Sequence, residues 1–267
     1  MFKLTLTSAL STARDFNRHG VAASISYLPR IKNEQREIAQ EVQEYTTVLE
    51  EISRNKLDSD LTVKLQQFGI FKDPRLTLDA LEILAEQAKA HNNFIWIDME
   101  RSHTVEDTIK IFEQLDDEFG NVGICLQAYL RRSRDDLDRI LERQAPVRLV
   151  KGFYNDSDIR NWQKVTDNYR SLMHELLSKS DRPCIATHDL DLVKEAIQRI
   201  KVEEIKKAEI QFFNGVRDDF AALLSQDGYN TRIYIPYGHV IGYLKDGLRT
   251  FDIRRHIQRL FGQNPIV

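Results

Sequence analysis

Several short apolar runs in this chain end in polar side chains, and those side chains could share one chemical site. From the second run onward they are Lys64, Asp98, Gln127, Arg148 with Lys151, Thr187 with His188, Gln211 and Tyr234. Each interrupts its apolar run at the equivalent position, close to the end of the run. If the runs are parallel strands of a barrel, their carboxyl ends meet at one rim, where barrel enzymes carry out their chemistry. The sequence therefore predicts one site at that rim.

Three kinds of site could use such a set. A metal centre needs a cluster of His, Asp or Glu ligands, and only His188 and Asp98 qualify. A glycosidase needs two facing carboxylates; Glu209 is the second candidate, but we expect it to point away from the strand-end residues. A set of Lys, Arg, Gln, Thr and His donors suits an electron-rich anionic ligand. Flavin fits, because its ring needs donors and its pyrophosphate needs cations or amides.

The elements that must position these residues recur along the chain. Eight runs rich in apolar and β-branched residues cover 21–28, 61–65, 94–98, 123–127, 147–151, 183–187, 208–212 and 231–235. Near-continuous apolar character is typical of parallel strands buried on both faces. Amphipathic helical patterns lie between them, over 76–90, 104–119, 133–143, 157–177, 190–200 and 214–224.

This alternation of strands and helices predicts a (β/α)8 TIM-type barrel with an extra N-terminal helical segment. An open doubly wound sheet is the competing architecture, but no GxGxxG motif follows any run. Helix-start signals stand at Asp73 with Pro74, at Ser102, and at Ser157 with Asp158. The long polar region 33–55 predicts a helix that packs outside the barrel or covers its bottom.

We expect one domain, because no composition shift or Pro/Gly-rich linker marks a boundary. Residues 1–267 would form a single flavin-binding barrel, with 1–57 holding the N-terminal helical decoration and the first strand. The chain is 42% hydrophobic and 30% charged, and its formal net charge of −3 indicates no basic surface for nucleic acid.

The cysteines and the hydropathy pattern indicate a cellular location. Cys125 and Cys184 lie in apolar runs, which predicts buried, reduced thiols and no zinc site. No apolar run approaches the length that spans a bilayer. We expect a cytoplasmic protein without an integral membrane segment, and a peripheral contact with a membrane stays open.

Seven motifs resemble segments of the proline dehydrogenase family and follow in the family's order. VRLVKGFYND at 147–156 is similar to the family signature R-x-V-K-G-A-Y. LTVKLQQFG at 61–69 and IWIDME at 95–100 resemble its second- and third-strand segments, and LQAYL, ATHD, EIQFFNG and RIYIPYG follow. The resemblance implies a (β/α)8 flavoenzyme that oxidises L-proline to pyrroline-5-carboxylate.

The resemblance also implies a role for each matched residue. FAD would be bound by Gln127, Arg148, Val150, Lys151, Gly152, Thr187, His188 and Gln211. Arg148 would lie near flavin N5 and stabilise reduced flavin with its permanent charge. Lys64, paired with Asp98, would face the substrate carboxylate. The walls around the substrate ring would be Tyr154, Tyr234 and Tyr243.

The resemblance fails in the last barrel helix, where the family carries Y-x-x-R-R-x-x-E and its two arginines clamp the proline carboxylate. Aligning Tyr243 with the family tyrosine puts Asp246 and Gly247 at the arginine positions. A second alignment restores the pair as Arg254 and Arg255, but it needs several inserted residues. We favour the first alignment because it needs almost no change in length.

Two further differences enlarge pocket side chains: Phe153 and Phe213 stand where the family usually has Ala and Leu. The expected function is FAD-dependent oxidation of L-proline, or of a related secondary amine or proline derivative, at the carbon next to nitrogen. A quinone or another electron acceptor would be required. The alternatives are a flavin- or small-molecule-binding barrel without proline turnover, or a carboxylate-based hydrolase.

Overall fold

Eight parallel strands close into a barrel in the computed structural model, which describes residues 4–29, 35–152, 154 and 156–240. The strands are β1 (Ala22–Leu28), β2 (Ser59–Lys64), β3 (Ile95–Asp98), β4 (Val122–Gln127), β5 (Val147–Val150), β6 (Pro183–Ala186), β7 (Glu209–Phe213) and β8 (Asn230–Gly238). Each pairs with the next along the chain, and β8 pairs with β1. The predicted (β/α)8 barrel and each of its eight strand runs are confirmed.

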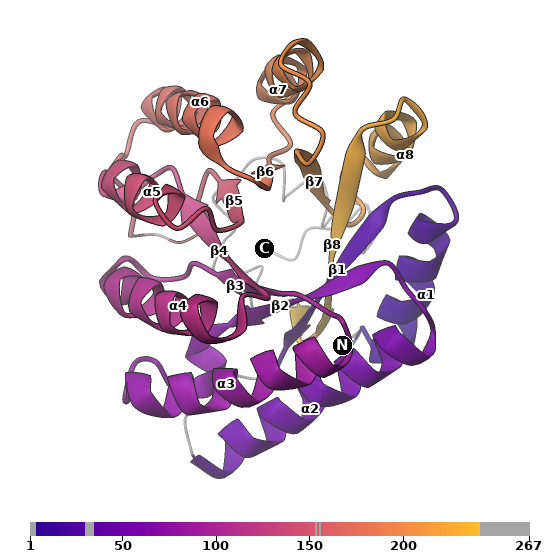
Figure 1. Cartoon of the computed structure of the whole chain (residues 1–267), viewed down its shortest axis with the longest axis vertical. Coiled ribbons are helices and arrows are strands. Elements are labelled where there is room, and N and C mark those ends of the chain that lie inside the picture. The colour runs from indigo at the N-terminus through magenta and orange to yellow at the C-terminus, as the bar shows by residue number, and fades with distance from the viewer. Residues whose placement is uncertain (1–3, 30–34, 153, 155, 241–267) are drawn as a thin grey trace, which may run out of the picture.

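Helices form a ring around these strands (Figure 1). They are α1 (Leu6–Asn17), α2 (Gln35–Arg54), α3 (Pro74–Ala90), α4 (Val105–Phe119), α5 (Ser133–Leu141), α6 (Trp162–Lys179), α7 (Leu190–Val202) and α8 (Asp218–Gln226). Short 3-10 helices η1 (Leu65–Phe68) and η2 (Ser102–Thr104) follow β2 and β3. In Figure 1, α1 lies between α8 and α2 and so completes the ring.

The long polar helix α2 packs on the outside of the barrel, as one of the two sequence-based alternatives had it. Its inward stripe of Tyr45, Val48, Leu49 and Ile52 is fully or almost fully buried. The other sides are polar and face solvent or α3. Spacing of three and four residues is what one face of a helix presents to a core.

One of the three helix-start signals is confirmed as a cap, and the other two are not. Asp73 caps α3 by accepting a hydrogen bond from the Arg75 amide, with Pro74 in the first turn. The signal at Ser102 does not cap α4, because Ser102 lies in the single turn η2; α4 begins at Val105, one residue after the predicted 104.

The predicted start of α6 at Ser157 was also wrong, because α6 begins at Trp162 under an Asn161 cap. The Asp158 carboxylate accepts a hydrogen bond from the Arg131 amide, and the Ile159 amide donates to the Tyr129 carbonyl. Long-range hydrogen bonds to the loop after β4 therefore hold this segment in a non-helical conformation.

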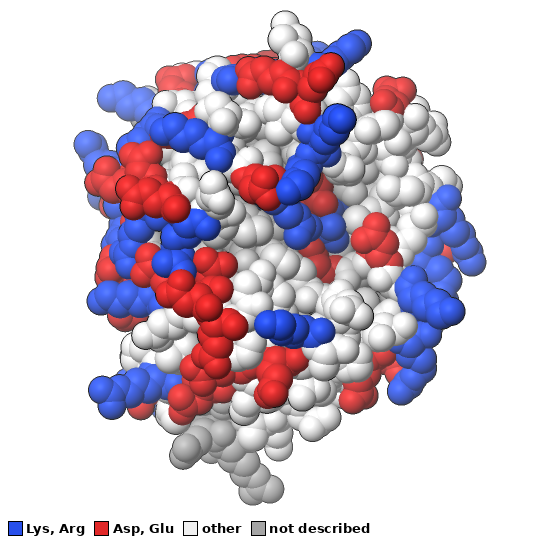
Figure 2. Space-filling view, viewed as in Figure 1, with Lys and Arg blue, Asp and Glu red and all other residues white. Residues whose placement is uncertain are grey.

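The outer surface carries interleaved charges of both signs. Figure 2 shows basic and acidic side chains side by side over α4 and α5. The ion pairs there join Arg132, Arg139 and Arg143 to Glu106, Glu113, Asp116, Asp117 and Asp136. Among the helices described, none is both long enough and apolar enough to cross a membrane.

Candidate active site

Lys64 and Asp98 form the centre of the predicted site. They occupy paired positions at the ends of β2 and β3, so the register alone brings their side chains together. Lys64 Nζ lies 2.5 Å from Asp98 Oδ2, and both side chains are largely buried. Burial alone would lower the pKa of Lys64, but Asp98, and after it Tyr234, Tyr154 and Glu100, hold that pKa well above its ordinary value. These neighbours therefore favour the charged ammonium form of Lys64.

Arg148 enters the barrel interior below this pair. Its Nη1 lies 3.4 Å from Asp98 Oδ1 and donates to Thr62, while its Nη2 donates to Ser24. The guanidinium carbon lies 4.6 Å from the ring centroid of Trp96. Arg148 Nε is buried and has no hydrogen-bond partner among the described atoms.

In the described part of the chain, Gln127 on the neighbouring strand β4 has an unpaired acceptor atom where Arg148 has an unpaired donor. Its side-chain nitrogen donates to the Met99 carbonyl at 2.9 Å, whereas its Oε1 is buried without a partner among the described atoms. Buried polar atoms are normally hydrogen-bonded, so the unpaired donor at Arg148 and the unpaired acceptor at Gln127 suit a ligand that offers both an acceptor and a donor. Flavin offers both: ring atoms that accept and a ring N–H that donates.

Val150, Lys151 and Gly152 close β5 and begin the loop after it. Gly152 has φ of +124°, and a Cβ there would lie 2.1 Å from Cδ1 of Tyr129, so this position requires glycine. Lys151 is not merely a solvated strand end, because its Nζ contacts Asp189 at 2.7 Å and Thr166 at 3.0 Å. Val150 is paired in register with Gln127.

Thr187 and His188 directly follow β6, and Gln211 lies in β7. Thr187 is buried and accepts a hydrogen bond from the Asp189 amide. His188 Nε2 accepts from the Phe213 amide at 2.9 Å, which fixes its ring. Gln211 donates inward to Glu209 at 2.5 Å.

Tyrosine side chains border the Lys64–Asp98 pair on two sides. The Tyr234 hydroxyl donates to Asp98 Oδ2 at 3.3 Å, and the Tyr234 ring lies against Phe213 at a centroid distance of 5.4 Å. The Tyr154 hydroxyl donates to Glu100 Oε1 at 3.1 Å. The sequence-based predictions at Tyr243, Asp246, Gly247, Arg254, Arg255 and Phe153 lie outside the described residues.

Glu100 was not among the predicted site residues, although it belongs to the IWIDME motif at 95–100 that resembles the family. It is 2% exposed, and its Oε2 accepts a hydrogen bond from the Gln66 amide at 2.8 Å. Burial raises its pKa to about 7, against the opposing effect of Lys64. The I-D-x-E spacing could have indicated it, because residues two apart on an extended chain share a side.

The expectation that Glu209 points away from the strand-end residues was wrong. It shares the interior face with Gln211, two positions along β7. Both its oxygens accept from Arg232, at 2.8 and 2.9 Å. Burial alone would raise the pKa of Glu209, but Arg232 outweighs it and the pKa falls to about 2. Glu209 is thus committed to an ion pair rather than to a carboxylate dyad with Asp98.

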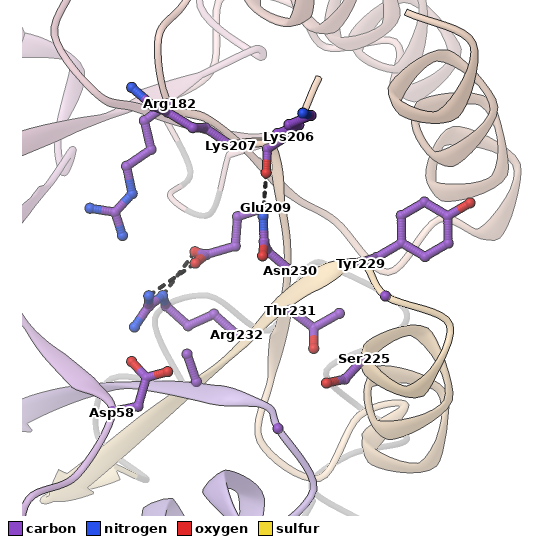
Figure 3. Close-up of a pocket in the computed structure, with 13 residues that line it drawn as sticks. Asp58, Arg182, Lys206, Lys207, Glu209, Ser225, Tyr229, Asn230, Thr231 and Arg232 are labelled. Atoms are coloured by element: carbon purple, nitrogen blue, oxygen red, sulfur yellow. Dashed lines mark hydrogen bonds and ion pairs between the residues drawn. The ribbon is translucent and has the colours of Figure 1, made fainter. Parts of the chain in front are cut away.

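A polar hollow of about 520 Å³ lies at the opposite end of the barrel, where the strands begin (Figure 3). Asp58, Arg182, Lys206, Glu209 and Arg232 are among its lining residues. The central guanidinium of Arg232 is already held by Glu209 and by Asp60, the latter at 3.1 Å. Because that end of a TIM barrel generally serves stability, the candidate active site is the rim around Lys64 and Asp98.

The sequence is similar to proteins of one family over most of its length. A family model described as proline dehydrogenase matches residues 9–245. Proline dehydrogenase 1 of Bacillus subtilis subsp. natto is 31% identical over 239 residues, which cover 88% of this chain and 79% of that protein. The proline dehydrogenase of Deinococcus radiodurans is 28% identical over 244 residues, with coverages of 88% and 79%.

Solved structures share the fold. Proline utilization A (PutA) from Bdellovibrio bacteriovorus, inactivated by N-propargylglycine, superposes with a TM-score of 0.83 at 19% identity. The match covers 97% of this chain and 32% of that one, so this chain spans about a third of the PutA protein. Because the family model matches residues 9–245 and a relative is 31% identical over most of both chains, this chain belongs to the proline dehydrogenase family of oxidoreductases.

Proposed function

We propose that this protein is an FAD-dependent dehydrogenase that oxidises L-proline, or a related secondary amine or proline derivative, at the carbon next to nitrogen. The observation that carries the cofactor assignment is the pair of orphaned atoms, Arg148 Nε and Gln127 Oε1, on neighbouring strands. FAD when bound supplies the acceptor for a hydride from the substrate carbon. Relatives named proline dehydrogenase support proline as the parent substrate.

The proposed cofactor-binding residues are Gln127, Arg148, Val150, Lys151, Gly152, Thr187, His188 and Gln211. Arg148 would offer the flavin ring a permanent positive charge and so would favour its reduced, anionic form. Gly152 would let the backbone come close to the ligand, and Lys151 would supply a cation for the phosphates. Lys151 remains paired with Asp189, so its contribution to phosphate binding is shared with that carboxylate.

The proposed substrate-binding residues are Lys64, Asp98, Tyr154, Tyr234 and Tyr243. Lys64 offers a fixed cation to the polar end of the substrate, while Asp98 neutralises part of that charge. Tyr154 and Tyr234 supply aromatic walls, and Phe213 fills the space beside Tyr234. A cation partly neutralised in this way favours an apolar ring over a strongly anionic ligand.

We further propose that residues 1–267 form one barrel domain that acts in the cytoplasm and passes its electrons to a quinone or another acceptor. Residues 1–57 would contribute the N-terminal helical decoration and the first strand to this domain. No nucleic-acid partner is expected, because the net charge of −3 offers no basic surface.

The visible spectrum of the purified protein tests this function. We expect yellow protein that releases FAD rather than FMN on denaturation and is bleached anaerobically by a secondary amine. Colourless protein after saturation with FAD would remove the proposal and favour a hydrolase. Bound flavin that no amine reduces would favour the barrel without turnover.

A further inference from the structure

Glu100 is a buried carboxylate whose two oxygens bind groups on different elements. Oε1 accepts a hydrogen bond from the Tyr154 hydroxyl after β5, at 3.1 Å, and Oε2 accepts from the Gln66 amide in η1, at 2.8 Å. Lys64 from β2 and Asp98 from β3 also act on its charge, and the Arg101 guanidinium carbon lies 4.7 Å from the ring centroid of Tyr154. Glu100 thus lies beside the candidate site and reaches it through Tyr154.

Amine oxidation by hydride transfer requires a neutral nitrogen, because its lone pair must assist the departure of the hydride. Secondary amines are protonated at neutral pH, so some group must take the ammonium proton. Lys64 cannot, because its pKa lies well above the ordinary value and it stays charged. Tyr154 and Tyr234 cannot, because burial raises their pKa values, that of Tyr234 to about 12.

Asp98 is already engaged by three donors. Its carboxylate receives hydrogen bonds from Lys64, Arg148 and Tyr234, at 2.5, 3.4 and 3.3 Å. It is the counter-charge that both buried cations share. Glu100, by contrast, has a pKa raised to about 7 by burial, so its proton occupancy changes near neutral pH.

We propose that Glu100 accepts the proton of the substrate ammonium through the hydroxyl of Tyr154. The proposal rests on the proposed function. The substrate N–H bond breaks as its proton passes to the Tyr154 oxygen. The hydroxyl proton of Tyr154 passes to Glu100 Oε1 and forms a new O–H bond there. The nitrogen becomes neutral, the tyrosine is unchanged, and Glu100 becomes a neutral acid; no electrons are transferred in this step.

The first experiment is the pH profile of anaerobic flavin reduction in the holoenzyme, with L-proline and L-proline methyl ester as probes at low concentration. In the unmodified protein the rate should rise about tenfold per pH unit up to about 7 and then level off. In Glu100→Gln the rate should be at least about 100-fold lower near pH 7. It should keep rising with pH toward the pKa of the substrate amine, because only amine that is already neutral can then react.

Two further variants separate proton transfer from structure. Tyr154→Phe should reproduce the pH profile of Glu100→Gln, although Glu100 itself is intact. Glu86→Gln, a change at an exposed carboxylate on α3, should behave like the unmodified protein. Infrared titration of the purified proteins gives a second readout: a carboxyl band that titrates near pH 7 should be present in Tyr154→Phe and missing in Glu100→Gln.

The outcomes are distinct. A Glu100→Gln variant with the unmodified pH profile, or with a rate reduced equally at every pH, would overturn the role of Glu100 and leave the proposed function standing. A holoenzyme that neither probe nor any other secondary amine reduces would overturn both. Rescue of Glu100→Gln at high pH, together with loss of the infrared band, supports the proton-transfer step.

Discussion

Asp98 stands between two buried cations, with Lys64 on one carboxylate oxygen at 2.5 Å and Arg148 on the other at 3.4 Å. The two cations come from β2 and β5, and Asp98 comes from β3. One carboxylate therefore sets the electrostatics of both proposed parts of the site, the substrate end at Lys64 and the flavin end at Arg148.

Replacing Asp98 by Asn should destabilise the protein by roughly 3–5 kcal/mol, because two buried cations lose their counter-charge. The loss is measurable as a shift in the midpoint of urea denaturation. Asp15→Asn is a matched control, since it breaks the exposed Arg18–Asp15 pair and should cost less than about 1 kcal/mol. Equal effects of the two changes would show that the Asp98 pairs contribute little.

Replacing Arg148 by Ala should lower the flavin midpoint potential and slow flavin reduction by about 100-fold, because the reduced, anionic ring loses its stabilising charge. Arg148→Lys should restore the charge but not the planar donor fork, and so should rescue only part of the potential. Spectroelectrochemical titration measures both values. If Arg148→Ala keeps the original potential, the side chain does not lie beside the flavin ring.

Substrate choice should differ from that of relatives with the arginine pair. Under the favoured alignment Asp246 and Gly247 replace that pair, and the described cations Lys64 and Arg148 are both partly neutralised by Asp98. Free L-proline should therefore reduce the flavin more slowly than L-proline methyl ester in stopped-flow experiments. Fast, saturable reduction by free proline would point instead to Arg254 and Arg255, and then Arg254→Ala and Arg255→Ala should each weaken proline binding.

Stability toward acid should depend on Glu209. Its pKa in the folded protein is lowered to about 2, below the ordinary 4.5. The ion pair with Arg232 therefore stabilises the protein fully above pH 4.5, and that stabilisation is lost as the pH falls from 4.5 toward 2. The contribution is about 3 kcal/mol, since each pKa unit corresponds to about 1.4 kcal/mol.

Glu209→Gln should abolish this part of the acid dependence and should destabilise the protein at neutral pH, because Arg232 then loses one of the two carboxylates that form ion pairs with it and keeps Asp60 and the Ala23 carbonyl. Denaturation midpoints between pH 2 and pH 7 test both expectations. The exposed change Glu86→Gln should leave the pH dependence of stability as it is. If Glu209→Gln loses stability between pH 4.5 and pH 2 as the unmodified protein does, Glu209 is not the group responsible.

The strands were predictable from sequence because burial on both faces of a parallel strand leaves a continuous apolar run. The pairing of Lys64 with Asp98 was expected from the resemblance to the family, and the register of β2 and β3 explains it, because the two residues occupy paired positions. The start of α6 was not predictable, because Asp158 and Ile159 bind the loop after β4, about 30 residues away in sequence. Such long-range hydrogen bonds override a local capping signal.

Inside the barrel, Glu100 and Glu209 also depend on long-range contacts that local sequence does not reveal. The I-D-x-E spacing could mark the position of Glu100, but its proposed role depends on Tyr154, which is 54 positions away and which no local pattern identifies as its partner. Glu209 was misplaced because an interior ion pair with Arg232 makes a charged residue acceptable on the buried face of β7. Whether a carboxylate lies inside a barrel depends on a partner that the sequence does not identify.

The pairing of β1 with β8 is the seam that closes the barrel, and it must form late in synthesis. Seven residue pairs join these strands, from Ala22 with Arg232 to Leu28 with Gly238, and α1 lies over both. The two edges come from opposite ends of the described chain, so the barrel closes only after β8 has left the ribosome. Until then β1 offers an unpaired edge to other chains. Chaperone dependence and aggregation during synthesis should therefore be governed by this last seam, which the early-made α1 shields on its outer side.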